Sequence, residues 1–154
     1  MDFGGHKGAC GLVIDKKNID KFKAALNLVA KERIADNDLY PTIDIDMDVE
    51  LSQLSEKLVE EIGLLQPFGP GNPRPVFSSS GVYLRNEPRR ISKNGFKMWV
   101  TNDTVTCEAV SFRAEGMSIP AKGSKVSLVY TPSINTWQGV SSLQLDLKDL
   151  KVDS

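Results

Sequence analysis

The sequence predicts an α+β chain, in which a small βαβα piece is followed by a five-stranded β-barrel. Two apolar stripes with helical spacing occur before residue 67, and alternation with a period of two residues dominates after residue 80. A segment rich in proline and glycine separates these two patterns, and such a composition marks a boundary. We therefore expect three parts, which are residues 1–66, a connector over 67–77, and a β-domain over 78–154.

The first piece begins with an apolar run over residues 9–14, which predicts a short buried strand. Asn18 is then placed to cap a helix, because its side chain can accept from the amides of the first turn. The helix ends before Asp36-Asn37-Asp38 and Pro41. Its apolar residues recur at steps of three to five positions: Ile19, Phe22, Leu26, Val29 and Ile34.

Strict alternation follows over residues 43–50. Apolar Ile43, Ile45, Met47 and Val49 alternate with acidic Asp44, Asp46, Asp48 and Glu50. This pattern predicts a half-buried strand whose outer face carries carboxylates. Carboxylates are ligands for hard cations, but side chains about 6–7 Å apart along a strand do not converge on one ion. The plainer interpretation is a solvated face that repels DNA or docks on a basic neighbour.

A second helix is predicted over residues 51–65, with a leucine-rich stripe and a cap from Ser52 or Ser55. The connector over 67–77 then carries four prolines and two glycines in eleven residues. It lacks the Gly-Lys-Ser/Thr ending of a phosphate-binding loop. We expect a stiff connector whose two ends are packed by Phe68 and Phe77.

Five short candidate strands follow Gly81 and are separated by turn-forming sequences. Five strands in about seventy residues fit a small barrel such as the OB-fold. The number of strands also fits an SH3-like barrel, so the strand pattern leaves both open. The predicted strands are 82–85, 96–101, 104–112, 124–131 and 143–150.

Composition excludes several classes of protein. One His and two Cys cannot build a zinc finger, and two Cys are too few for a disulfide scaffold, which fits a reducing compartment such as the cytoplasm. Short apolar runs predict no transmembrane span, and the first residues lack the pattern of a signal peptide. Cys10 and Cys107 are interpreted as small buried residues, because no acid or base gathers around either of them.

The net charge of −1 conceals an asymmetry along the chain. Residues 1–66 hold 8 basic and 13 acidic side chains, a balance of −5, whereas residues 67–154 hold 11 basic and 7 acidic ones, a balance of +4. A positive second half favours a polyanionic partner, although an ordinary solvated surface can have the same balance.

The outer face of the predicted barrel offers residues for binding single-stranded nucleic acid. In the strand over 96–101, Phe96, Met98 and Val100 are expected to point inward, which leaves Lys97, Trp99 and Thr101 outside. Bases stack on exposed aromatic rings, and cations hold the phosphate backbone. The alternative is that the aromatic rings cover a barrel end or an interdomain contact. The candidate DNA contacts are Tyr83, Arg85, Arg89, Arg90, Lys93, Lys97, Trp99 and Trp137.

The single histidine, His6, follows a pair of glycines, Gly4 and Gly5. Glycines allow close approach of a ligand to the backbone, and an imidazole beside them can donate a hydrogen bond to a phosphate. A purely structural histidine is the alternative.

Two motifs carry a resemblance to a known family. The segment Phe3–Gly11 resembles the Gly-Gly-His-x-x-Ala-x-Gly motif of the DHH-associated domain in the DHH phosphoesterase superfamily. Residues 67–77 are similar to the Pro-Phe-Gly-x-Gly-Asn-Pro-x-Pro-x-Phe signature of the RecJ family of single-stranded-DNA exonucleases, and this motif is the more specific of the two. The stretch from Trp137 to Leu145 resembles the end of the OB domain in that family.

The resemblance implies that residues 1–66 are the C-terminal part of a DHH-associated domain and that residues 78–154 are an OB-fold domain. Enzymes of this family degrade single-stranded DNA from its 5′ end, with Mn²⁺ or Mg²⁺ held by aspartates and histidines of a DHH domain. This chain has one His and no Asp-His-His motif. We therefore expect a C-terminal portion without the catalytic metal site, which holds no metal itself and is inactive alone.

The resemblance also implies roles for residues and partners. Gly4, Gly5 and His6 would hold a DNA phosphate near the metals, and in isolation His6 is expected to be exposed and disordered. The implied partners are single-stranded DNA and an N-terminal DHH catalytic domain, with a single-strand-binding protein or a repair helicase in addition, and no membrane. A cytoplasmic, bacterial setting in DNA repair and recombination follows from the same family.

Two other classes of function stay open. The chain could be a structural or protein-interaction module that clamps an exonuclease core or recruits a repair partner, with little DNA affinity of its own. It could also be a hydrolase that uses the acidic strand around Asp46 for a metal. Burial of Tyr83, Trp99 and Trp137 would favour the first of these alternatives.

Overall fold

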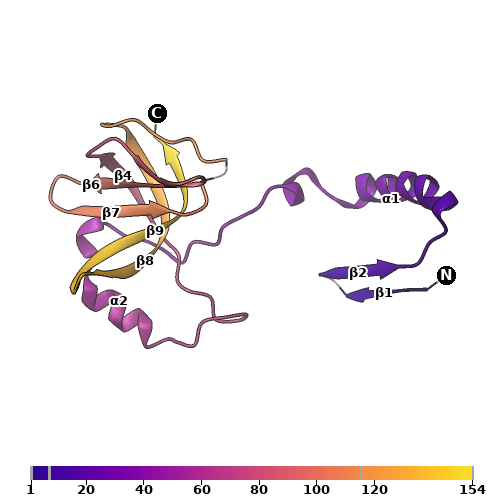
Figure 1. Cartoon of the computed structure of the whole chain (residues 1–154), viewed down its shortest axis with the longest axis horizontal. Coiled ribbons are helices and arrows are strands. Elements are labelled where there is room, and N and C mark those ends of the chain that lie inside the picture. The colour runs from indigo at the N-terminus through magenta and orange to yellow at the C-terminus, as the bar shows by residue number, and fades with distance from the viewer. Residues whose placement is uncertain (1, 7, 115, 154) are drawn as a thin grey trace. The chain divides into compact units, whose positions relative to one another are not determined.

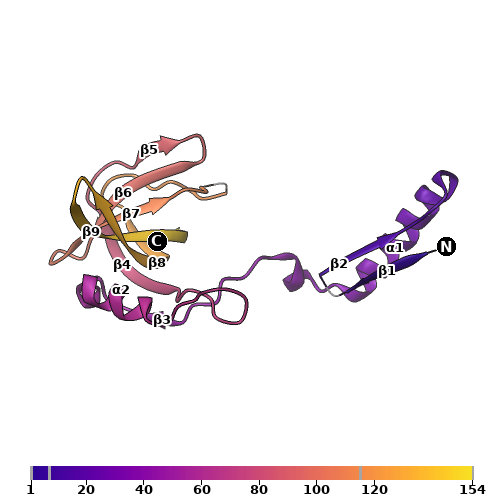
Figure 2. The same cartoon turned by 60° about the horizontal axis from the view of Figure 1, so that its bottom comes forward.

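The computed structural model describes residues 2–6, 8–114 and 116–153 and divides the chain into two compact units. The first unit is Met1–Ile43, and the second is Asp44–Ser154. Figures 1 and 2 show the elements of each unit from two directions. The division lies before the acidic segment and not at Pro67, where the change in composition occurs.

The first unit consists of a hairpin and a helix. Strands β1 (Phe3–His6) and β2 (Ala9–Leu12) pair in antiparallel fashion. A short 3-10 turn, η1 (Lys16–Asn18), leads into helix α1 (Ile19–Arg33), and η2 (Asp36–Leu39) follows. The helix agrees closely with the sequence prediction, but Asn18 makes no side-chain capping hydrogen bond.

The first unit has no closed core, since none of its described residues is buried. Every residue of β2 is exposed, so the prediction of a buried strand over 9–14 is wrong. Cys10 is exposed as well, against expectation. The physical reason is that one hairpin and one helix provide too little surface to cover each other's apolar faces, and Phe3 and Leu26 remain exposed on them.

The second unit is built on one seven-stranded sheet with the order β3-β4-β8-β9-β7-β6-β5, and β4 also pairs with β6. The pairs β3–β4 and β7–β9 are parallel, and the other pairs are antiparallel. All five predicted strands occur, and β8 and β9 are longer than predicted. The strands are β3 (Met47–Asp48), β4 (Phe77–Leu84), β5 (Arg89–Ser92), β6 (Gly95–Thr101), β7 (Thr106–Ser111), β8 (Lys125–Trp137) and β9 (Val140–Val152).

The core of this unit lies on the inner side of these strands. Phe96, Met98 and Val100 of β6 are buried, as the alternation predicts. Tyr130 of β8 is fully buried, and its hydroxyl lies 2.8 Å from the hydroxyl of Ser79 in a hydrogen bond. This bond satisfies two polar groups that would otherwise be costly to bury.

The acidic segment differs from its prediction. Only Met47–Asp48 forms a strand, and the apolar side chains of Ile45 and Met47 are exposed. The carboxylates make the contacts instead, because the amide of Val76 donates to Asp46 Oδ2 at 2.8 Å and the hydroxyl of Ser78 donates to Asp48. The expected half-buried strand is therefore wrong, because its apolar side chains Ile45 and Met47 are exposed. Asp46 and Asp48 are exposed as well, and they accept hydrogen bonds from donors at the start of β4 and just before it.

The segment after β3 is anchored to the sheet core. Leu51 in the 3-10 turn η3 (Leu51–Gln53) and Leu54 after it are buried in the same cluster as the strands. Helix α2 (Glu56–Gly63) then begins at Ser55, whose hydroxyl accepts from the amide of Leu58 at 3.1 Å. Of the two predicted caps, Ser52 and Ser55, the structure confirms Ser55. The helix is shorter than predicted because Leu54 and Ser55 have extended backbones. The elements of the expected βαβα piece are thus divided between the two units.

The proline-rich connector is a hydrogen-bonded loop. The side-chain amide of Asn72 donates to the carbonyl oxygens of Leu65 and Pro67 at 2.8 and 2.9 Å. The guanidinium of Arg74 lies 5.1 Å from the centroid of the Phe68 ring, and Phe77 is buried in the core. Among the described residues, no helix has the length and apolar character that crossing a membrane requires.

Candidate nucleic-acid interface

Trp99 lies at the centre of a polar surface on the outside of the sheet. Residues directly opposite each other on paired strands share a face, and Trp99 is opposite Glu108 of β7, which in turn is opposite Gln144 of β9. On the other side of Trp99, the amide of Arg85 donates to its carbonyl oxygen at 2.9 Å. We call this surface the outer face. It comprises Tyr83, Arg85, Arg89, Lys97, Trp99, Thr106, Glu108 and Gln144.

Two aromatic rings are exposed on the outer face. Tyr83 and Trp99 are each 41% exposed, which confirms the predicted outward orientation. Tyr83 is opposite Thr101, two residues along β6 from Trp99, so both aromatic side chains belong to the same surface. Arg89 is opposite Lys97 and places a further exposed cation beside them.

A concavity of about 470 Å³ opens beside Trp99 and is lined by Arg85, Asn86, Trp99 and Thr106. Arg85 Nη1 donates to Thr106 Oγ1 at 3.2 Å, and the amide of Trp99 donates to Asn86 Oδ1 at 2.8 Å. These bonds hold the guanidinium at one side of the concavity and tie the backbone of Trp99 to the residue that follows Arg85. The concavity therefore combines an aromatic wall with a positioned cation.

Lys97 is engaged within the protein. Its ammonium lies 2.7 Å from Glu108 Oε1, and Gln144 Nε2 donates to Glu108 Oε2 at 2.9 Å. The Glu108 side chain is only 12% exposed, so this ion pair is screened less than one in open solvent. Lys97 consequently offers less net charge to a phosphate than Arg85 or Arg89 does.

Arg90 belongs to β5, and Lys93 lies in the turn between β5 and β6. Arg90 Nη1 donates to the carbonyl oxygen of Lys93 at 3.0 Å. The two residues line a separate small concavity of about 110 Å³ together with Phe96 and Ile119. The structure thus separates these two predicted contacts from the concavity at Trp99.

Trp137 lies at the tip of the long hairpin formed by β8 and β9. It is opposite Val140, and the two side chains are 72% and 70% exposed. Gln138 and Gly139 between them have positive φ values of 50° and 82°, as a tight two-residue hairpin turn requires.

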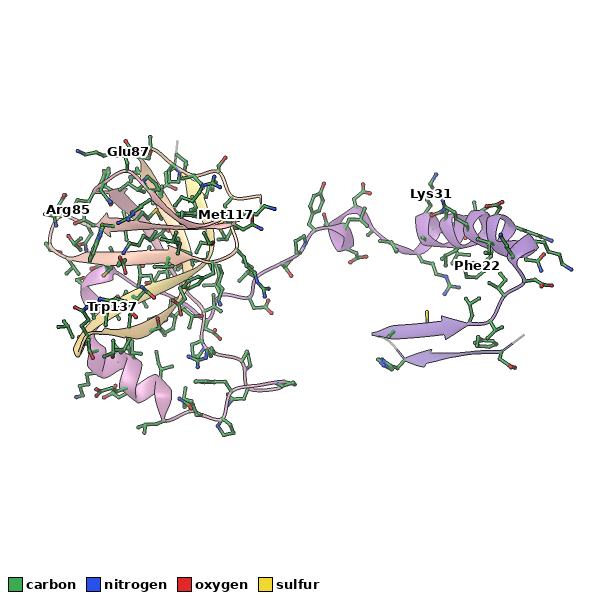
Figure 3. The ribbon with its side chains drawn as sticks, viewed as in Figure 1. Phe22, Lys31, Arg85, Glu87, Met117 and Trp137 are labelled. Carbon is green, nitrogen blue, oxygen red and sulfur yellow. The ribbon has the colours of Figure 1, made fainter. Side chains whose placement is uncertain are left out.

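The hairpin continues the side of the sheet that carries the outer face. Ser133 lies on the same strand face as Trp137 and is opposite Gln144 of the outer face. Figure 3 shows Arg85 and Trp137 on the same side of this unit.

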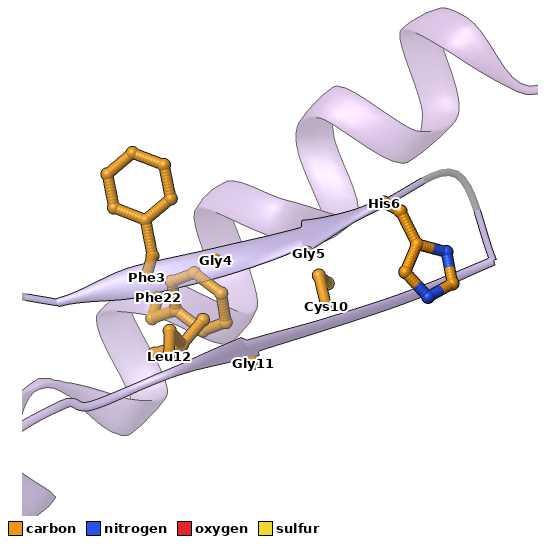
Figure 4. A pocket seen from close by; sticks show the side chains of 8 residues that line it. All are labelled: Phe3, Gly4, Gly5, His6, Cys10, Gly11, Leu12 and Phe22. Atoms are coloured by element: carbon orange, nitrogen blue, oxygen red, sulfur yellow. The ribbon is translucent and has the colours of Figure 1, made fainter.

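Gly4, Gly5 and His6 belong to the first unit and line a groove of about 680 Å³ between the hairpin and α1. Figure 4 shows His6 at the turn end of the hairpin and Leu12 with Phe22 near its other end. A Cβ atom at Gly5 would approach the Ala9 carbonyl oxygen to 2.6 Å, so the hairpin itself requires this glycine. A Cβ atom at Gly4 would meet nothing within 4 Å, so packing within the described part of the chain does not explain that glycine.

His6 is exposed, as expected, but it forms part of β1, so the expectation of disorder is not met. Its Nδ1 atom accepts from the amide of Gly8 at 3.1 Å. In a neutral imidazole the other nitrogen, Nε2, then carries the proton and is a donor. This geometry suits a contact with an anionic oxygen.

The groups with shifted pKa values lie in the core. Burial raises the pKa of the Cys107 thiol, and Cys107 is buried as expected. Burial also raises the pKa of Tyr130 to about 12, against the opposing effect of its hydrogen bond with Ser79.

Within residues 2–6, 8–114 and 116–153, no group of three or more His, Cys, Asp or Glu side chains is placed to hold a metal ion.

Sequence reasoning missed four residues of this region, which are Asn86, Thr106, Glu108 and Gln144. The alternation in the predicted strand over 104–112 contained a signal for two of them, because Thr106 and Glu108 alternate with apolar Val105, Cys107 and Ala109. Asn86 and Gln144 act through partners that are distant in sequence, and local patterns carry no signal for such pairs.

The family profile and the similar proteins all point to the same family, RecJ. The sequence profile of the family described as "RecJ OB domain" matches residues 45–149. The chain is 28% identical over 153 residues to the single-stranded-DNA-specific exonuclease RecJ of Bacillus subtilis, which covers 97% of this chain and 19% of that protein. It is 26% identical over 148 residues to the RecJ of Haemophilus influenzae, with 94% and 26% coverage. The chain thus spans about a fifth to a quarter of the length of these relatives.

The fold agrees with solved structures. The crystal structure of RecJ in complex with Mg²⁺ from Thermus thermophilus superposes with a TM-score of 0.77 at 22% identity, over 100% of this chain and 23% of that one. The Mn²⁺ complex of the same protein gives a TM-score of 0.76 at 21% identity, with 22% of that chain covered. At this level of identity the superposition supports the fold.

Proposed function

Since the chain belongs to the RecJ OB domain family, we propose that it is the single-stranded-DNA-binding portion of a RecJ-like 5′–3′ exonuclease that acts in DNA repair and recombination. Its curated relatives carry the name single-stranded-DNA-specific exonuclease over chains four to five times its length. In this proposal the hydrolysis belongs to a DHH catalytic domain, which holds Mn²⁺ or Mg²⁺, and the present chain supplies the contact with the strand.

The observation that carries the proposal is the exposed pair Tyr83 and Trp99 beside Arg85 and Arg89 on one surface. Single-stranded nucleic acid binds where bases can stack on aromatic rings and cations follow the backbone. Exposure of Tyr83 and Trp99 favours this function over a purely structural module. The pairing of β4 with β6 further supports a closed five-stranded OB barrel, which binds oligonucleotides on this part of its surface.

Gly4, Gly5 and His6 have a separate role in the proposal. The bare backbone at Gly4 and the donor at His6 Nε2 would contact a DNA phosphate close to the metals of the catalytic domain. The support is the open space around Gly4 and the hydrogen bond that Gly8 donates to His6 Nδ1. The catalytic domain is accordingly the proposed protein partner of the first unit.

A second candidate function rests on the tip of the β8–β9 hairpin. Residues 131–145 contain no charged side chain, although a quarter of the whole chain is charged. An uncharged tip with exposed Trp137 and Val140 suits a protein surface better than a phosphate backbone. The chain would then recruit a partner such as a single-strand-binding protein or a repair helicase, with little DNA affinity of its own.

Fluorescence anisotropy with labelled oligo(dT) and the full chain tests the first function. Binding is expected at low salt, and the logarithm of the association constant should fall linearly with the logarithm of salt concentration, because each cation–phosphate contact releases counterions. The Arg85→Ala and Arg89→Ala changes should each reduce the steepness of that line by about 0.7, the value for one contact with a single strand.

Lys57→Ala is the matched control, because Lys57 lies on α2 and pairs there with Glu61. This change removes one charge outside the outer face and should leave the salt dependence unaltered. Absence of oligo(dT) binding at low salt would reject DNA binding by this chain and favour the protein-interaction module.

A further inference from the structure

We propose that the concavity formed by Arg85, Asn86, Trp99 and Thr106 is a subsite for one unpaired nucleobase, which stacks on Trp99 and accepts a hydrogen bond from Arg85. This inference rests on the proposed function and narrows it from a surface to four residues. It assigns a role to Asn86 and Thr106, which the sequence patterns did not single out.

The concavity has the size and the aromatic wall that a site for one base requires. Its volume of about 470 Å³ lies in the range of small-molecule sites, roughly 300–1,000 Å³. Trp99 is 41% exposed as a residue, so part of its side chain is open to solvent while the rest is packed against the protein. A partly supported ring has a fixed orientation, which lowers the entropy lost when a base stacks on it.

Two hydrogen bonds fix the other groups before any base arrives. Thr106 Oγ1 accepts from Arg85 Nη1 at 3.2 Å, and Asn86 Oδ1 accepts from the Trp99 amide at 2.8 Å. A guanidinium has five N–H donors, and the bond to Thr106 uses one of them. Arg85 can therefore donate to a base while Thr106 holds it in place, and Asn86 and Thr106 are positioning residues.

The charged residues beside the concavity leave Arg85 available to a nucleotide. Glu108 is opposite Trp99, but its two carboxylate oxygens already accept from Lys97 and Gln144. This network compensates the negative charge that would otherwise repel a nucleotide. It also engages Lys97, which leaves Arg85 as the cation at the rim of the concavity.

The chemistry of the subsite predicts which nucleic acids it accepts. Every base has a π-face and at least one acceptor atom on its edge, so an aromatic wall and a donor accept all four bases. In a duplex both faces of an internal base are stacked against neighbouring bases, so duplex DNA cannot fill the subsite. The expected ligand class is an unpaired base of any sequence within a single strand.

The test compares oligo(dT) with an abasic deoxyribose–phosphate oligomer of equal length, which has the same charge and no bases. With the full chain, Trp99→Ala should weaken oligo(dT) binding by about 5-fold to 150-fold, the range for loss of one stacked base. Binding of the abasic oligomer should be unchanged. Trp99→Phe retains a π-face and should restore part of the affinity, which separates stacking from a folding defect.

Fluorescence gives a second, independent readout, because the chain contains two tryptophans, Trp99 and Trp137. In the Trp137→Phe variant the emission of Trp99 should be quenched by oligo(dT) and unaffected by the abasic oligomer. Thr106→Val in this background should reduce the affinity for oligo(dT) while the quenching at saturation persists. Tyr40→Ala, an exposed aromatic of the first unit, is the control and should change neither measurement.

The possible failures are distinguishable. If oligo(dT) binds but Trp99 emission is unchanged and Trp99→Ala retains full affinity, the base subsite is rejected and DNA binding by the chain stands. If both oligomers bind equally well, the contact is with phosphates alone and the subsite is again rejected. If neither binds at low salt, the proposed function fails and the subsite fails with it.

Discussion

At the scale of single residues, hydrogen-bond partners separate side chains that the sequence treats as equivalent. Lys97 and Arg85 are both cations on the outer face, but Lys97 is paired with the largely buried carboxylate of Glu108, whereas Arg85 is held by the neutral hydroxyl of Thr106. The guanidinium thus keeps its net charge for a ligand. The same reasoning applies in the acidic segment, where donors from Val76 and Ser78 engage Asp46 and Asp48.

Tyr130 should make the stability of the protein fall at alkaline pH. Its pKa is raised from an ordinary 10.0 to about 12 in the fold, so between these values the unfolded chain binds fewer protons than the native one. The free energy of unfolding is then unaffected below pH 10 and falls as the pH rises towards 12, by about 3 kcal/mol in total.

Urea unfolding at a series of alkaline pH values measures this effect. Tyr130→Phe is the control, because phenylalanine does not titrate. The variant should be less stable at neutral pH, since Ser79 loses one of its two hydrogen-bond partners and keeps only the Val49 carbonyl oxygen, but its stability should fall less steeply above pH 10. Parallel curves for the two proteins would show that Tyr130 is not responsible.

At the scale of elements, the segment between the acidic strand and the connector belongs to the β-unit. Its local pattern is helical, and the helix α2 does form, but Leu51 and Leu54 precede that helix and enter the core beneath the strands. The parallel pairing of β3 with β4 attaches the segment a second time. A helical stripe shows that a face is apolar, and only the tertiary packing shows which core receives it.

Leu51→Ala should therefore destabilise the whole β-unit. Leu51 is 1% exposed, and truncation of a buried leucine costs about 2–5 kcal/mol in free energy of unfolding. Leu64→Ala is the matched control, because Leu64 follows α2 and is 84% exposed, so its truncation should change stability by less than about 0.5 kcal/mol. Urea unfolding followed by tryptophan emission reports on the sheet. Equal stability of the two variants would contradict the anchoring of this segment in the core.

At the scale of the whole molecule, the charge asymmetry has a different meaning from the one that the sequence indicates. The β-unit, residues 44–154, contains 12 basic and 14 acidic side chains, a balance of −2. The negative segment over 44–66 and the positive remainder are thus parts of one compact body. Attraction of DNA then depends on the local arrangement of cations such as Arg85 and Arg89 and not on the net charge of a domain.

The two units should differ in cooperativity when they are produced separately. Residues 44–154 contain the buried cluster of the chain, so this polypeptide should retain a cooperative thermal transition. Residues 1–43 have no buried residue among those described and should melt without a cooperative transition. Circular dichroism of both polypeptides and the full chain measures this. A sharp transition in residues 1–43, or its absence in residues 44–154, would contradict the assignment.

Local properties of the chain could be predicted from the sequence alone. The period-two pattern of β6 predicted which residues are buried and that Trp99 is exposed, because alternation is a property of each strand by itself. The Pro-Phe-Gly signature likewise indicated the family that the profile match later supported. Ser55 was one of two predicted caps, beside Ser52, since capping involves residues only three positions apart.

Contacts between distant residues were decided by the tertiary structure. The pairing of Lys97 with Glu108, the bond between Arg85 and Thr106, and the burial of Leu51 join positions that no local period connects. The same holds for the exposed hairpin of the first unit, where an apolar run has too little covering surface to become buried. Burial and charge pairing depend on which surfaces meet in space, and a one-dimensional pattern records only which surfaces are available.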